Sequence, residues 1–136
     1  MSMIKKTQPY LYGPLLALAL LAGTAAQAGG NHQHDHKPLH GGIVAEASDL
    51  DFELLLSRPG QITLYVRDHG KPLPLNGASA RLTLLSGSDK REASLVAVGG
   101  ERLEAQGDFK LAAGSKVVAL VQLPGRKPVN VRFALK

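Results

Sequence analysis

Short apolar runs separated by turn residues are the feature of this sequence that most restricts its fold. After Gly42 no stretch keeps the apolar spacing of an amphipathic helix. Glycine, proline, asparagine and aspartate interrupt the chain instead, at short intervals that are typical of strands joined by tight turns. The predicted strands are Ile43–Ala47, Phe52–Arg58, Ile62–Arg67, Ala80–Ser86, Ala93–Val98, Arg102–Gln106, Lys116–Leu123 and Val129–Leu135.

Several of these runs alternate between apolar and polar residues, as half-buried strands do. Ile62, Leu64 and Val66 share one predicted face, and the run 129–136 repeats the same period of two. This pattern predicts an all-β fold, an immunoglobulin-like antiparallel β-sandwich of seven or eight strands, with a small closed barrel as the alternative. The predicted core is Phe52, Leu54, Leu64, Val66, Leu82, Leu84, Val117, Val121, Val131, Phe133 and Leu135.

The first residues have the features of a secretion signal. Lys5 and Lys6 form a basic start, Leu15–Ala22 is apolar, and Ala26 and Ala28 flank a small-x-small cleavage site. The apolar stretch is much shorter than the roughly 20 residues of a membrane-spanning helix. We therefore expect a cleaved signal peptide, a periplasmic protein and no membrane anchor after cleavage.

The character of the chain changes at Gly41-Gly42. Residues 29–42 are polar and rich in histidine, which predicts a flexible arm, whereas residues 43–136 carry the strand pattern of one β-domain. The predicted organisation is thus a signal peptide over residues 1–28, a His-rich arm and a single domain.

Histidine is concentrated in the arm. His32, His34, His36 and His40 fall within nine positions, and His69 is the fifth and last histidine. Imidazole is the commonest metal-coordinating side chain, so these five residues are the predicted metal ligands. Cysteine is absent, and both methionines lie in the predicted signal, which leaves nitrogen and oxygen ligands. Such ligands favour Cu(II), Zn(II), Ni(II) or Co(II).

The histidines differ in how firmly the chain holds them. His32, His34 and His36 alternate, so an extended arm spaces them too widely for one ion and must fold around it. His40 lies where the arm meets the domain, and the glycines after it permit a sharp turn over a sheet edge. A joint site of His40, His69 and the arm is the sharper hypothesis; a solvated arm with exposed linker and loop histidines is the alternative.

Acidic residues follow the arm closely. Alternation places Asp51 and Glu53 opposite Phe52 and Leu54, which predicts a solvated strand face. The alternative is that one acidic side chain binds the non-ligating ring nitrogen of a histidine and so fixes the orientation of the imidazole. The sequence leaves the choice open among Glu46, Asp49, Asp51, Glu53 and Asp68.

Two other classes of function are disfavoured. Removing Lys5 and Lys6 lowers the net charge from +5 to +3, the remaining basic residues are scattered, and aromatic residues are few, so no nucleic-acid surface is predicted. No nucleophile elbow or phosphate-binding loop occurs, and a flexible arm holds catalytic groups poorly. We do not expect an enzyme.

Three segments carry a family resemblance: His40-Gly41-Gly42-Ile43-Val44, Asp51-Phe52-Glu53-Leu54, and the run from Leu64 to Pro72. They resemble small exported periplasmic proteins associated with heavy-metal resistance. They are also similar to the β-domain of adaptor subunits from heavy-metal efflux pumps of the resistance-nodulation-division type. The chain lacks the long helical hairpin and lipoyl-like domain of such adaptors. The resemblance implies metal handling in the periplasm.

Together these features predict a periplasmic protein that binds a divalent transition metal and buffers it or delivers it to an efflux or resistance system. A component of a heavy-metal efflux pump is the expected partner. The alternative is an immunoglobulin-like interaction module of the cell envelope, whose His-rich arm is incidental.

Overall fold

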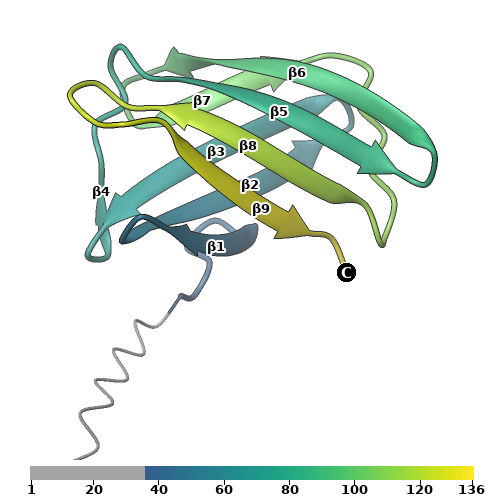
Figure 1. Ribbon diagram of the computed structural model, residues 1–136, viewed down its shortest axis with the longest axis horizontal. Coiled ribbons are helices and arrows are strands. Elements are labelled where there is room, and N and C mark those ends of the chain that lie inside the picture. Colours follow the sequence, from purple (N-terminus) through teal and green to yellow (C-terminus); the bar gives the residue numbers. More distant parts are fainter. Residues whose placement is uncertain (1–35) are drawn as a thin grey trace, which may run out of the picture. The chain divides into compact units, whose positions relative to one another are not determined.

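The computed structural model describes residues 36–136, and these residues form nine strands and no helix (Figure 1). The all-β prediction is confirmed, and the predicted strands β1 and β7 have the observed bounds. The predicted signal peptide, His32 and His34 lie outside the described residues. The strands are β1 (Ile43–Ala47), β2 (Leu50–Arg58), β3 (Gln61–Asp68), β4 (Lys71–Pro72), β5 (Ser79–Ser86), β6 (Asp89–Val98), β7 (Arg102–Gln106), β8 (Lys116–Gln122) and β9 (Val129–Ala134).

All strand pairs are antiparallel and belong to one continuous sheet. The strand order is β1-β2-β3-β7-β6-β5-β8-β9, with the short β4 paired to β3. The sheet curls until β1 lies beside β9, which gives a nearly closed barrel (Figure 1). The finer prediction of an immunoglobulin-like sandwich is not confirmed, because the pairing of β3 with β7 joins what would be two separate sheets. Residues 36–136 include no helix that is long and apolar enough to span a membrane.

The interior of the barrel is filled by the apolar side of each strand. All eleven residues of the predicted core are buried, and residues such as Ile62, Leu95 and Leu103 complete it. On β9 burial alternates residue by residue, so Val129, Val131 and Phe133 face inward. Such alternation of buried and exposed residues is expected of a strand that has one face in the core and the other in solvent.

One strand was not predicted, and four begin earlier than expected, β3 and β5 by a single residue and β2 and β6 by more. β4 is only two residues long and contains a proline, so it lacks the alternating run that identifies a strand. β2 begins at Leu50 and β6 at Asp89, because ladder pairing continues into residues whose polarity resembles that of a turn.

Candidate metal centre

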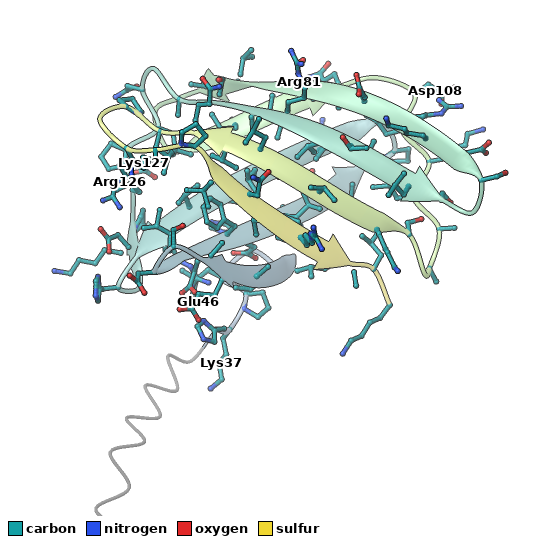
Figure 2. The ribbon with its side chains drawn as sticks, in the orientation of Figure 1. Lys37, Glu46, Arg81, Asp108, Arg126 and Lys127 are labelled. Carbon is teal, nitrogen blue, oxygen red and sulfur yellow. The ribbon has the colours of Figure 1, made fainter. Side chains whose placement is uncertain are left out.

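The seven residues immediately before β1 are fastened to the outside of the barrel. We call residues 36–42 the strap. Its contacts are made with side chains of β2 and β3 that point away from the apolar core, and with Glu46 of β1. Figure 2 shows Lys37 of the strap and Glu46 on the same side of the molecule. The strap therefore covers a sheet face that the sequence pattern predicts to be solvated.

His36 is held between two carboxylates. Its Nδ1 lies 2.8 Å from Oδ1 of Asp51, and its Nε2 lies 3.2 Å from Oε2 of Glu46. Glu46 and Asp51 are direct partners in the β1–β2 ladder, so their side chains emerge on the same face. The register of two antiparallel strands thus places the carboxylates, and the strap brings the imidazole to them.

These three residues offer one ligand atom each within 4.8 Å of one another. A nitrogen and two carboxylate oxygens form a donor set suited to Zn(II), Cu(II), Ni(II) or Co(II). Three protein ligands leave the fourth position of a four-coordinate ion open to water or to another side chain. An ion binds the ring nitrogen that carries no proton, because histidine coordinates metals as neutral imidazole.

Glu53 fastens the middle of the strap. Its Oε1 accepts hydrogen bonds from the backbone N–H of His40 at 2.8 Å and of Gly42 at 3.0 Å. Its Oε2 accepts from the N–H of Leu39 at 3.1 Å and from the imidazole of His40 at 3.0 Å. Only 1% of the Glu53 residue surface is exposed, so these four donors replace the water that an ionised carboxylate requires.

The electrostatics of Glu53 follow from two opposed effects. Burial raises the pKa of the carboxyl, but the hydrogen bonds from Gly42, His40 and Leu39 outweigh it and leave the pKa below its ordinary value of 4.5. The ionised form is therefore the one that the strap stabilises. Since its four contacts occupy the carboxylate, Glu53 acts as an anchor for the strap rather than as a free metal ligand.

His40 is fixed in orientation by two neighbours. Its Nδ1 bonds Glu53, and its ring stacks on Tyr65 with centroids 3.7 Å apart and an interplanar angle of 4°. A histidine that binds a metal commonly donates a hydrogen bond from its other ring nitrogen to a carboxylate. In His40 the nitrogen bonded to the carboxylate is Nδ1, so Nε2 is the atom able to reach an ion. His40 does not belong to the group formed by His36, Glu46 and Asp51.

Arg67 fastens the start of the strap. It lies opposite Asp51 in the β2–β3 ladder, is 5% exposed, and donates a hydrogen bond of 3.1 Å from Nη2 to the carbonyl of Lys37. Arg67 and Tyr65 were not among the predicted site residues. Arg67 pairs with Asp51 and Tyr65 pairs with Glu53, so an alignment of β2 with β3 would have pointed to both residues.

His69 occupies a different place, the turn between β3 and β4. Its φ of 49° is the left-handed conformation expected of histidine in a tight turn. Its Nδ1 lies 2.5 Å from Oδ1 of Asp68, whose Oδ2 accepts a bond of 3.1 Å from Arg126. These two hydrogen bonds lower the pKa of Asp68. In the described part of the chain, His69 is not gathered into a group of metal ligands with His36 or His40.

The prediction that Asp51 and Glu53 lie on a solvated face is wrong. Both are directed away from the apolar core, as alternation requires, but the strap covers them and leaves them 9% and 1% exposed. Four of the carboxylates that the sequence left open as imidazole partners do contact a histidine: Glu46 and Asp51 contact His36, Glu53 contacts His40, and Asp68 contacts His69. Asp49, in contrast, lies exposed in the β1–β2 turn with a φ of 61°.

Comparison of the chain with protein-family models, with curated proteins and with solved structures finds no match.

Proposed function

We propose that this protein is a periplasmic binder of a divalent transition metal, Cu(II), Zn(II), Ni(II) or Co(II), that buffers the ion or delivers it to an efflux or resistance system. The observation that carries the proposal is the convergence of His36, Glu46 and Asp51, whose ligand atoms lie within 4.8 Å of one another. His32 and His34 precede His36 in the same histidine tract, and the imidazole of either is the proposed ligand for the open position.

The arrangement suits a carrier better than a permanent structural site. Glu46 and His36 are exposed, and the structural zinc sites of proteins are closed and usually built from cysteine. A shell of exposed oxygen and imidazole ligands exchanges its ion with a partner more readily than a buried one. The barrel has its own apolar core, so the ion adds to stability only by mass action.

Titration of the purified protein with Co(II) and Zn(II) tests the proposal. Glu46→Gln removes one ligand at an exposed position, and we expect the dissociation constant to rise at least about tenfold. Glu92→Gln, on the exposed part of β6, is the matched control and should bind as the original protein does. Equal affinity of Glu46→Gln and the original protein would exclude the site.

The same titration separates the proposal from its alternative. If the protein is an immunoglobulin-like interaction module with an incidental arm, a peptide of residues 29–42 should bind the ion as tightly as the whole protein. If the folded site takes part, the peptide binds more weakly. Delivery to an efflux system predicts that cells lacking the protein lose tolerance of the ion that it binds most tightly.

A further inference from the structure

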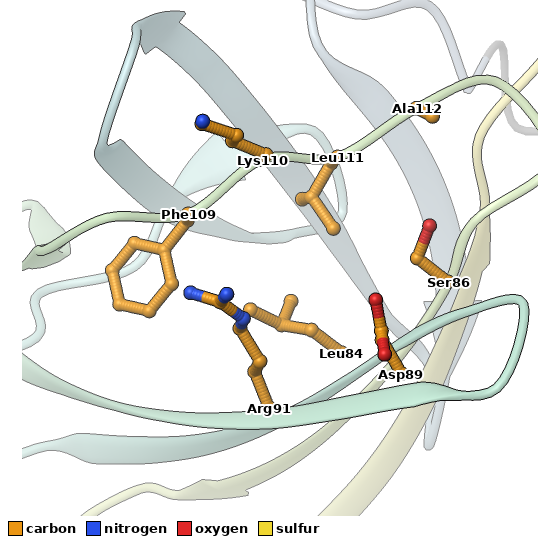
Figure 3. A pocket seen from close by; sticks show the side chains of 8 residues that line it. All are labelled: Leu84, Ser86, Asp89, Arg91, Phe109, Lys110, Leu111 and Ala112. Atoms are coloured by element: carbon orange, nitrogen blue, oxygen red, sulfur yellow. The ribbon is translucent and has the colours of Figure 1, made fainter.

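A second site lies at the end of the barrel and is independent of the metal centre. A cavity of about 430 Å³ opens between the β5–β6 hairpin and the segment that joins β7 to β8. Figure 3 shows Leu84, Asp89 and Arg91 on one side of it and Phe109 and Leu111 on the other. Its size falls within the range of about 300–1,000 Å³ that is typical of small-molecule sites, which often occupy the mouths of barrels.

The β5–β6 register places this cavity at the end of the inward face of the barrel. Leu84 pairs with Arg91, so the two side chains share a face, and Leu84 is a core residue with 3% exposure. On β6 the inward positions run from buried Leu95 and Ala93 to Arg91 and then Asp89. The inward face of one strand thus changes from apolar to charged where the cavity begins.

The two charges stand apart from each other. Arg91 is fixed by a hydrogen bond of 2.8 Å from its Nη1 to the carbonyl of Asp108. In residues 36–136 no ion pair joins Asp89 to Arg91, and Leu84 lies between them in Figure 3. Arg91 and Asp89 therefore stand on either side of an apolar floor, and Lys110 is a second cation of the lining that points away from Arg91.

We propose that this cavity binds a free apolar amino acid in its zwitterionic form. The ligand carboxylate would pair with Arg91, whose planar guanidinium offers two parallel donors. The ammonium group would pair with Asp89, beside the hydroxyl of Ser86. The apolar side chain would lie against Leu84, Phe109 and Leu111. A ligand with a single charge would leave the opposite protein charge unmatched in a partly desolvated site.

Isothermal titration of the full chain with L-phenylalanine and L-leucine is the direct measurement. We expect saturable binding of at least one of them. Removal of the ligand amine, as in 3-phenylpropionate, or of its carboxylate, as in phenethylamine, should weaken binding at least about tenfold, because each loss leaves one protein charge unpaired. Binding of 3-phenylpropionate as tight as that of L-phenylalanine would overturn the zwitterion assignment, and absence of binding by both amino acids would overturn the site.

Variants locate the binding. Arg91→Gln and Asp89→Asn should each weaken L-phenylalanine binding at least about tenfold. Arg81→Gln, on the outward face of β5, is the matched control and should bind normally (Figure 2). All three positions are exposed, and thermal unfolding of each variant verifies that it is folded. If Arg91→Gln is folded and binds like the control, the proposal is wrong whatever the outcome of the metal titrations.

Discussion

The β8–β9 pair and the β2–β3 pair have similar sequence patterns but different outer faces. On β9 every second residue is exposed, and β8 follows the same alternation. On β2, residues 50–54 are all buried, and on β3 Thr63 and Arg67 are buried although they alternate with core residues. The difference lies in what covers each pair on the outside.

The strap accounts for the burial of the charged residues on the outer face of the β2–β3 pair. It lies over β1 to β3 and is bonded by Asp51, Glu53 and Arg67, whereas β9 keeps a polar, solvated outer side. A face with charged residues is thereby buried without an apolar partner, because each charge finds a hydrogen bond in the strap. A buried charge that is fully paired fixes one arrangement of the strap, and removal of the charge leaves its partners unsatisfied.

Glu53→Gln is the substitution expected to have the largest effect. The amide keeps the shape of the carboxylate, but it loses the charge and turns an NH2 group toward donors that need an acceptor. We expect the free energy of unfolding to fall by about 2–4 kcal/mol, which urea denaturation measures.

Glu92→Gln is the matched control on β6, where the side chain is exposed, and its effect should stay within about 0.5 kcal/mol. If both variants lose the same small amount of unfolding free energy, the strap does not stabilise the barrel. The strap would then not explain the contrast between the β2–β3 and β8–β9 pairs.

Acid should remove the same contribution. The pKa of Glu53 is lowered in the folded protein, so its ionised form stabilises the fold at pH values above the unfolded pKa of about 4.5. This stability is lost as the pH falls through the folded pKa. The difference in unfolding free energy between the original protein and Glu53→Gln should therefore be constant near neutrality and shrink below about pH 4.5. A difference that stays constant to pH 3 would contradict an anchoring role of the ionised carboxylate.

The comparison also shows how far the sequence determines the structure. The alternating residues of β9 identify the strand, its inner face and its core members, because both faces follow from local polarity. On β2 the same reasoning gives the correct inner face through Phe52 and Leu54 but the wrong environment for Asp51 and Glu53. Their burial depends on residues that are 11 to 15 positions away and bond them after a turn.

The candidate metal centre was partly predictable for the same reason. His36 and the acidic residues were recognisable by type, but their grouping requires the register that pairs Glu46 with Asp51. The curling of one sheet, rather than the stacking of two, depends on the pairing of β3 with β7 across a long connection. Local periodicity contains no information on which distant strands become neighbours.

Gly42→Ala tests the close approach of the strap to β2. A methyl group at this position would lie 2.4 Å from the carbonyl oxygen of Leu54, and both groups belong to backbone that cannot rotate away. We expect a loss of about 2 kcal/mol, which thermal or urea unfolding measures. Gly41→Ala is the control at the neighbouring position. A methyl group there meets nothing within 4 Å, and only the φ of 79° disfavours the substitution. Its cost should be about 1 kcal/mol, and a larger cost at Gly41 would place the constraint in the turn rather than in the contact.

The smallest effect is expected from replacing an arginine by glutamine, once on β3 and once on β9. Arg67 on β3 and Arg132 on β9 both point away from the core, but Arg67 is buried and bonds the carbonyl of Lys37, while Arg132 is exposed. Arg67→Gln should lower the free energy of unfolding by about 1–2 kcal/mol, because it removes a charged hydrogen bond under the strap. Arg132→Gln should change it by less than about 0.5 kcal/mol.

Amide hydrogen exchange shows where in the molecule the Arg67→Gln variant is weakened. The N–H groups of Leu39, His40 and Gly42 should lose protection before those of β8 and β9, since the strap opens locally while the barrel stays closed. If protection falls equally throughout the barrel, the strap is part of the cooperative core rather than a separate layer bonded to it.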